Sequence, residues 1–141
     1  MDPLPHTLHI ATACFIDSSN ALLVVRKRGT QSWMLPGGKL DAGETPEQAV
    51  VREVEEELQV ALRRGDLTHL GNFQAMAANE PDTRVNASAF LAKLPGGQQF
   101  SLAAEIEAMD WLPLDEPIPS NVAPLLREHI IPALLAKAVI S

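Results

Sequence analysis

The chain has 141 residues, of which 46% are hydrophobic and 21% charged, and its formal net charge is −7. This length and composition predict one folded domain, residues 1–141, and exclude a disordered chain. The acidic balance argues against bulk DNA or RNA binding, which needs a basic face.

Residues 1–10, MDPLPHTLHI, contain an acid and prolines in place of the basic and apolar regions of a secretory signal. No apolar stretch is long enough to span a membrane. The single cysteine, Cys14, excludes an internal disulfide and fits a reducing compartment. We therefore expect a cytoplasmic protein.

Residues 7–15 are apolar and β-branched, which predicts a buried strand. Residues 18–20, SSN, predict a turn, and residues 21–28 predict a second strand, so we expect the two strands to pair as a hairpin. The segment 34–40, MLPGGKL, is punctuated by glycine and proline and predicts a loop.

A helix from residue 46 to about residue 58 is the most clearly marked element. Thr45 is a favourable N-cap, Pro46 suits the first helical position, and Gln48 completes a capping box. The N-terminus of this helix is thus predicted from three neighbouring residues.

Two further strands are expected at 67–77 and 84–93, and a short one at 108–114. The polar loop 79–84 is interpreted as a turn, with the alternative that it lines a substrate pocket. Residues 120–139 predict a closing amphipathic helix. Ser120 or Asn121 would cap this helix and Pro132 would kink or break it. Strands flanked by helices indicate an α/β fold.

The helix 46–58 carries an unusual concentration of acids. At 100° per residue its apolar stripe contains Val50, Val51, Val54 and Leu58, whereas Glu55 points away. Glu53, Glu56 and Glu57 share a third face and lie within reach of a common point. Magnesium or manganese suits such hard oxygen ligands.

A solvated acidic face is the alternative reading of any charge run. Two features favour a metal site instead. The acids lie in the last turns of the helix, where the helix dipole disfavours negative charge. They also follow the Gly37–Gly38 loop at a short, fixed distance.

The spacing Gly38, five residues, Glu44, seven residues, then Arg52-Glu53-Val54-x-Glu56-Glu57 resembles the Nudix box of the Nudix hydrolases, in particular the MutT-like members. The resemblance covers residues 38–60. It implies an α/β/α sandwich with a mixed β-sheet between helices. It also implies a metal-dependent pyrophosphohydrolase that cleaves a nucleoside diphosphate linked to another moiety. One position departs from the pattern, because Gln59 stands where the family has a helix-ending glycine.

By the same resemblance, the metal ligands are Glu53, Glu56, Glu57 and the carbonyl of Gly38, with Mg²⁺ or Mn²⁺ as the cofactor. Arg52 and Glu44 would orient the acids. The general base is left open between a box glutamate and an acid from a distant loop. Glu105, shortly before Trp111, is a candidate for that acid, with a solvated loop acid as the alternative.

Candidate substrate contacts surround the glycine loop. Gly37, Gly38 and Lys39 lie in it, Trp33 precedes it as a candidate for stacking on a base, and Arg26 is a candidate phosphate contact. Asn86 and Ser88 alternate with apolar residues and would face a polar cleft. The histidines show no zinc-ligand spacing.

The substrate is expected to be a small nucleotide, with nucleoside triphosphates, normal or oxidised, favoured because markers of other subfamilies are missing. The alternatives are a non-catalytic nucleotide-binding regulatory domain and, with weak support from Cys14, an isoprenoid diphosphate isomerase. A homodimer is compatible with the resemblance, although the C-terminal helix could equally cover the monomer's own sheet.

Overall fold

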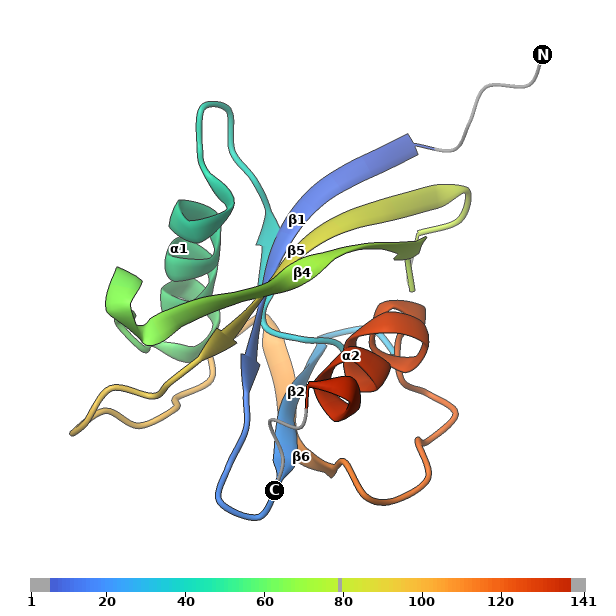
Figure 1. Ribbon diagram of the computed structural model, residues 1–141. Helices are drawn as coiled ribbons and strands as arrows, with labels where there is room; N and C mark the ends of the chain where they lie inside the picture. The colour runs from blue at the N-terminus through green and yellow to red at the C-terminus, as the bar shows by residue number, and fades with distance from the viewer. Residues whose placement is uncertain (1–5, 79, 138–141) are drawn as a thin grey trace.

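The computed structural model describes residues 6–78 and 80–137. In these ranges, three strands precede the first α-helix, and three more strands lie between this helix and the C-terminal helical segments (Figure 1). The strands are β1 His6–Phe15, β2 Ala21–Lys27, β3 Gly37–Lys39, β4 Leu67–Met76, β5 Thr83–Ala92 and β6 Ile106–Pro113. The helical segments are α1 Pro46–Leu58, a 3₁₀ turn Arg64–Asp66, a π-helical turn Leu126–Ile130 and α2 Ile131–Ala136.

The strands form two sheets. The larger has the order β3-β1-β5-β4, with β1 parallel to β5 and the other neighbours antiparallel. The smaller sheet pairs β2 with β6 in antiparallel fashion. The larger sheet is therefore mixed, as expected.

The predicted hairpin between the first two strands is wrong. The turn exists, with the Asp17 carboxylate accepting bonds from Ser19 N and Ala21 N at 2.9 Å. Beyond it, only an isolated bridge joins Ile16 to Leu22. Both strands are apolar on both faces, so local sequence fixes the turn but not the partners, which are β3 and β5 for β1.

The larger sheet separates two apolar clusters. Alternation along β1 sends Ala11, Ala13 and Phe15 to the cluster under α1, and Cys14 to the cluster under the C-terminal segment. Figure 1 shows α1 on one side of the strands and α2 on the other. The predicted α/β/α sandwich with a mixed sheet is confirmed.

The predicted helix over 46–58 is confirmed with its cap. Thr45 Oγ1 accepts from Gln48 N, and the Gln48 side chain accepts from Thr45 N. The buried face differs from the predicted stripe, because Val51 is only half-buried whereas Glu57 is buried. Gln59 ends the helix in the left-handed conformation, with φ 57°.

The segment expected as a helix over 120–139 is shorter and irregular. It begins with a π-helical turn at Leu126, so neither Ser120 nor Asn121 caps it, and residues 138 and 139 lie outside the described residues. Pro132 is the second residue of α2 and directly follows the π-helical turn, so the helix is irregular next to the proline that was expected to kink or break it.

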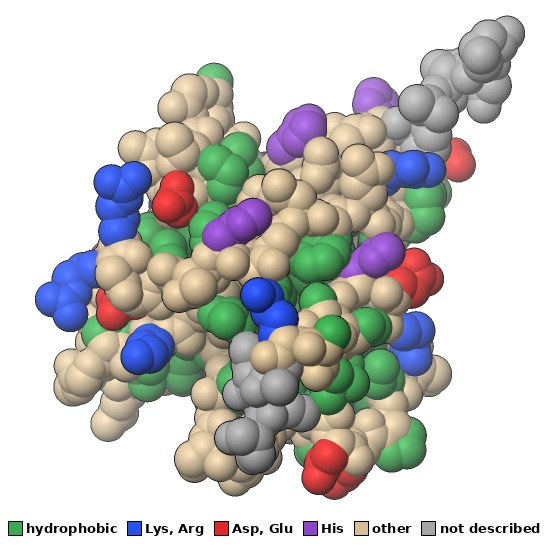
Figure 2. Space-filling view, viewed as in Figure 1, with side chains coloured by type: hydrophobic (Ala, Val, Ile, Leu, Met, Phe, Trp, Pro, Cys, Tyr) green, Lys and Arg blue, Asp and Glu red, His purple; other side chains and the backbone are tan. Residues whose placement is uncertain are grey.

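The C-terminal segment covers the protein's own sheet. Leu126, Ile130 and Leu134 are buried in the cluster on that side. Leu135 on α2 is 45% exposed, and hydrophobic side chains gather around α2 on the face drawn in Figure 2. Among the described residues, the helices are too short or too polar to cross a membrane.

Candidate active site

The glycine loop presses directly against β1 and α1. Gly37 has φ 144°, and a Cβ on it would lie 2.1 Å from Ala11 O. A Cβ on Gly38 would lie 2.6 Å from Glu53 Cδ. Only glycine fits at position 37, whereas a side chain at position 38 would displace the Glu53 carboxylate. The predicted loop residues 37–39 form the short strand β3 against β1. The Glu53 carboxylate thus rests on bare backbone.

Arg52 connects the acids of the helix to the loop before it. Its Nε donates to Glu44 Oε2 at 2.8 Å and its Nη2 to Glu44 Oε1 at 3.0 Å. Its Nη1 donates to Glu53 Oε2 at 2.9 Å and to Glu56 Oε1 at 3.3 Å, and its Nη2 also donates to Lys39 O at 3.0 Å. Arg52 therefore bonds to Glu44, Glu53 and Glu56 at once, a contact pattern compatible with the orienting role that the resemblance implies.

The charges in this network shift one another's titration. The Arg52 hydrogen bonds lower the pKa of Glu44 to about 2, with a further contribution from the Asp41 N–H. The same bond to Glu44, followed by the contact with Glu53, raises the pKa of Arg52. Both partners remain ionised across the physiological range.

Glu57 is buried against the glycine loop and does not itself line the pocket. Its side chain is 1% exposed, and its Oε1 accepts from Gly37 N at 3.1 Å. Burial raises the pKa of Glu57 to about 8, against the lowering effects of the Gly37 bond and Lys27. An adjacent cation would be needed to hold this carboxylate ionised at neutral pH.

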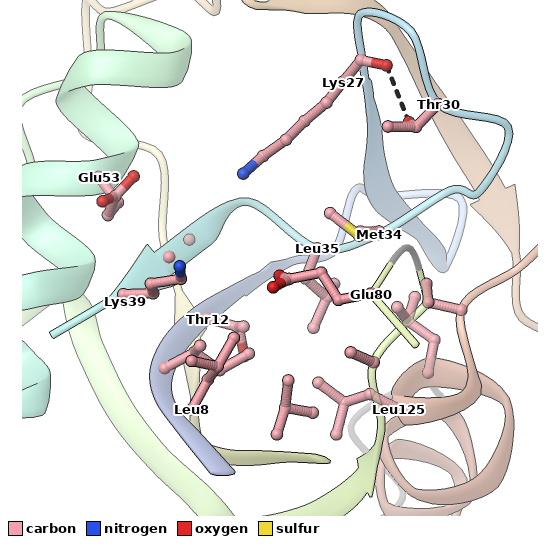
Figure 3. A pocket seen from close by; sticks show the side chains of 18 of the residues that line it. Leu8, Thr12, Lys27, Thr30, Met34, Leu35, Lys39, Glu53, Glu80 and Leu125 are labelled. Atoms are coloured by element: carbon pink, nitrogen blue, oxygen red, sulfur yellow. Dashed lines mark hydrogen bonds between the residues drawn. The ribbon is translucent and has the colours of Figure 1, made fainter. Parts of the chain in front are cut away.

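A pocket of about 550 Å³ opens in front of the loop (Figure 3). One end is lined by Gly37, Gly38, Lys39, Glu53, Glu56 and Glu105. The other end is apolar and is lined by Leu8, Ile10, Met76, Val85, Leu125 and Leu126. Leu8 and Ile10 share a face of β1 with Thr12, so one strand runs beneath both ends.

Six of the predicted site residues line the polar end. Arg52, Glu44 and Glu57 are linked to them by hydrogen bonds, directly or through Arg52. Arg26 and Trp33 lie apart from the site. Arg26 Nη1 donates to Glu107 Oε1 at 2.8 Å and its guanidinium lies 5.6 Å from the centroid of the Trp33 ring. Neither Arg26 nor Trp33 lines the pocket. The pairing of β2 with β6 shifts register between Arg26 and Lys27, and of these two neighbours only Lys27 lines the pocket.

Glu105 reaches the pocket from the segment before β6. Arg28 holds this segment, since its N donates to Glu105 O at 2.9 Å and its Nε donates to Ala104 O at 3.0 Å. Ala103 N also donates to Glu57 O at 2.9 Å. The segment is therefore attached to the C-terminal end of α1 itself.

Among the ionisable lining residues, sequence reasoning missed Lys27 and Asp41 and kept Glu80 only as an alternative. Lys27 belongs to a run of three basic residues, 26–28, and the irregularity between Arg26 and Lys27 hides from the sequence which of them faces the pocket. Glu80 belongs to the loop interpreted as a plain turn, and the alternative reading, that this loop lines a pocket, is the one the structure supports at Glu80.

A second, smaller hollow lies elsewhere on the larger sheet. Asn86, Ser88 and Asn72 line it, and Ser88 Oγ donates to Asn72 Oδ1 at 2.9 Å. The polar cleft predicted at Asn86 and Ser88 is therefore present, apart from the main pocket. Cys14 is buried, and burial raises its pKa to about 12, so it behaves as an apolar side chain.

The donor set fits a hard divalent cation. Carboxylate oxygens and a bare glycine carbonyl are magnesium-type ligands, and a Cβ on Gly38 would fill the space beside Glu53. Among the described residues, no three His, Cys, Asp or Glu side chains lie close enough together to coordinate one metal ion as they stand. Here Arg52 provides the positive charge beside Glu53 and Glu56.

Comparison with known proteins agrees with this geometry. The model of the NUDIX domain family matches residues 7–134. An 8-oxo-dGTP diphosphatase of Proteus vulgaris is 34% identical over 88 residues, which are 60% of this chain and 74% of that protein. The 8-oxo-dGTP diphosphatase of Escherichia coli K12 is 27% identical over 124 residues, covering 79% of this chain and 92% of that protein.

Solved structures agree as well. The MutT NUDIX hydrolase from Burkholderia pseudomallei superposes with a TM-score of 0.64 at 30% identity, covering 81% of this chain and 89% of that one. The family model spans nearly the whole described chain, including the glycine loop, α1 and β6. The chain belongs to the Nudix hydrolase family and is an enzyme that cleaves phosphoanhydride bonds, a diphosphatase.

Proposed function

We propose that this Nudix hydrolase is a magnesium-dependent pyrophosphohydrolase of nucleoside triphosphates, normal or oxidised. The observation that carries the proposal is one pocket of about 550 Å³ whose lining combines carboxylates and glycine backbone with a set of apolar side chains that a nucleobase could contact. The relatives named as 8-oxo-dGTP diphosphatases support this substrate class.

The polar end suits the triphosphate. Lys27 and Lys39 line it and would attract phosphate oxygens. Glu53, Glu56, Glu57 and the Gly38 carbonyl would hold the cation, which neutralises phosphate charge and lowers the pKa of a water. Arg52 would keep Glu53 and Glu56 pointing at this position through its fixed pairing with Glu44.

The attacking water needs a proton acceptor on the pocket wall. Glu53, on α1, and Glu105, directly before β6, both line the polar end of the pocket. A carboxylate within hydrogen-bond reach of the water contributes about 10²–10⁴-fold to the rate. Glutamine variants at both positions identify the base, because only loss of the base removes the acidic limb of the pH–rate profile.

The experiment is a panel of nucleoside triphosphates, sugar nucleotides and dinucleotides, assayed with Mg²⁺ or Mn²⁺ for release of pyrophosphate and phosphate. We expect monophosphate and pyrophosphate from triphosphates. Glu53→Gln should reduce the rate on the order of 10²-fold or more, since it weakens the cation site. Glu55→Gln, with the same charge change on the exposed side of the helix, should not.

The competing proposal is a non-catalytic nucleotide-binding domain. Nucleotide binding without turnover across the whole panel would favour it. Equal rates for Glu53→Gln and Glu55→Gln would contradict the assigned site even if turnover is found.

A further inference from the structure

Glu80 is an acid in the otherwise apolar end of the pocket. The other titratable lining residues that the structure describes lie on the β3–α1 segment, at the end of β2 and just before β6. Glu80 comes from the loop between β4 and β5, next to Met76, Ala77 and Ala78, which also line the pocket. Figure 3 shows its side chain extending into the pocket.

The backbone around Glu80 is held in place. His6 N donates to Asp82 O at 3.1 Å, which ties the loop to β1. Ala77 N donates to Thr83 O at 2.8 Å across the base of the loop. Thr83 is buried, and its hydroxyl donates to Pro81 O at 3.0 Å. These bonds tie residues 77 and 81–83, which flank Glu80 in the loop, to one another and to β1.

The Glu80 carboxylate makes no hydrogen bond or ion pair with another residue that the structure describes. An ionised carboxylate only accepts hydrogen bonds, and two adjacent donors satisfy it best, in a bidentate pair. Glu80 is an exposed residue of the pocket wall, so a ligand in the pocket can reach its carboxylate with two adjacent donors.

Among the common nucleobases, guanine alone presents two adjacent donors, N1–H and the exocyclic N2–H₂. Adenine offers one donor beside the acceptor N1, and cytosine one donor beside the acceptor N3. Uracil and thymine offer one N–H between two carbonyls. Hypoxanthine keeps N1–H but lacks the exocyclic amine.

We propose that Glu80 is a specificity-determining residue that accepts hydrogen bonds from guanine N1–H and N2–H₂, so that the enzyme prefers guanine nucleotides. The inference rests on the proposed function and names the substrate class of that site. Oxidation of guanine at C8 leaves this edge unchanged, so Glu80 selects normal and oxidised guanine alike.

The test compares Glu80→Gln with Asp82→Asn. Both changes remove one negative charge from the same loop. Asp82 does not line the pocket, and asparagine accepts its positive φ of 53°. For each protein, kcat/KM is measured with dGTP, dITP and dATP, and binding of dGMP, dIMP and dAMP with Mg²⁺ is measured by calorimetry.

We expect the parent to prefer dGTP over dATP by roughly 10- to 100-fold, with dITP between them. Glu80→Gln should bring the dGTP-to-dATP ratio close to one, because the amide places a donor against the guanine donors. Asp82→Asn should keep the parent's ratio. Calorimetry should give the same order for the monophosphates.

A parent without guanine preference, or a Glu80→Gln variant that keeps the parent's ratio, would overturn the inference. The binding measurement separates the two proposals. Preference for dGMP in binding without any turnover would overturn the proposed hydrolysis alone. Turnover of all triphosphates with equal efficiency would overturn the role of Glu80 alone.

Discussion

At the scale of single residues, Glu57 is the most unusual group. It is buried, and its pKa is raised to about 8 because burial disfavours its charge. Glu53, four residues earlier, is accessible from the pocket and paired with Arg52. Two acids one turn apart on the same helix therefore differ in burial and in hydrogen-bond partners.

The raised pKa of Glu57 predicts a pH-dependent stability in the presence of a chelator. The unfolded chain releases this proton near pH 4.5, whereas the folded protein keeps it until about pH 8. The folded state thus binds more protons in this window, and the free energy of unfolding should fall as the pH rises from about 5 to 8. The slope attributable to Glu57 is at most about 1.4 kcal/mol per pH unit.

Melting temperatures at pH 5.5, 7 and 8 check this prediction. Glu57→Gln should flatten the dependence, because glutamine still accepts from Gly37 N but does not titrate. Glu55→Gln should keep the dependence of the parent. Identical slopes for Glu57→Gln and the parent would contradict a strongly raised pKa.

Thr12 predicts a stabilising substitution. Its Oγ1 is buried and has no hydrogen-bond partner among the residues that the structure describes. A buried hydroxyl without a partner costs about 1–3 kcal/mol. Thr12→Val keeps the shape and the β-branch suited to β1, so the free energy of unfolding should rise by about 1 kcal/mol.

Urea denaturation of Thr12→Val and Thr12→Ser measures the effect. The serine variant keeps the hydroxyl and loses a methyl group, so it should be less stable than the parent. A valine variant less stable than the parent would show that the hydroxyl is satisfied in solution.

At the scale of elements, the end of α1 raises the question of Gln59. The structure answers it: Gln59 keeps the left-handed cap that glycine would provide, with its N–H bonded to Glu55 O at 3.0 Å. A non-glycine residue pays roughly 1 kcal/mol for this conformation. The hydrogen bonds from the Gln59 side chain to Ser101 offset little of this conformational free energy, because they are long, at 3.3 and 3.4 Å.

We therefore expect Gln59→Gly to raise the free energy of unfolding by about 0.5–1 kcal/mol. Gln59→Ala should lower it slightly, since alanine keeps the strained φ and loses the Ser101 contacts. Thermal unfolding of both variants checks the order. A glycine variant less stable than the parent would mean that the Ser101 contacts outweigh the strain.

Local patterns predicted the elements better than their partners. The capping box fixed the start of α1 to the residue, since its bonds are made within four positions. The pairing of β1 was not predictable in the same way, because its partners β3 and β5 lie far apart in sequence and both faces of β1 are apolar. The C-terminal helix was over-predicted because an apolar pattern does not report a π-helical turn.

At the scale of the whole molecule, the site depends on contacts between distant segments. The box spacing predicted Gly38, Glu44, Arg52, Glu53 and Glu56, which lie on one continuous stretch. It did not predict that Glu57 would be buried, because that follows from Gly37 packing on β1. Lys27, Glu80 and Glu105 come from three other segments, and only the fold brings them together.

This arrangement predicts that a divalent cation stabilises the entire protein. Gly38 belongs to the larger sheet, Glu53 and Glu56 to α1, and Glu105 lies just before β6 of the smaller sheet. A cation held among them would connect both sheets through α1 and relieve repulsion between the acids. Because such an ion binds only the folded state, an ion concentration 100 times its dissociation constant adds about 2.7 kcal/mol to the free energy of unfolding.

Thermal unfolding over a Mg²⁺ series from micromolar to 10 mM measures this effect at constant ionic strength. We expect the melting temperature to rise with the logarithm of the Mg²⁺ concentration above the dissociation constant. Glu53→Gln should flatten the rise, and Glu55→Gln should preserve it. Equal rises for the two variants would place the stabilising ion elsewhere on the acidic surface, and a flat curve for the parent would contradict a cation site formed by the folded protein alone.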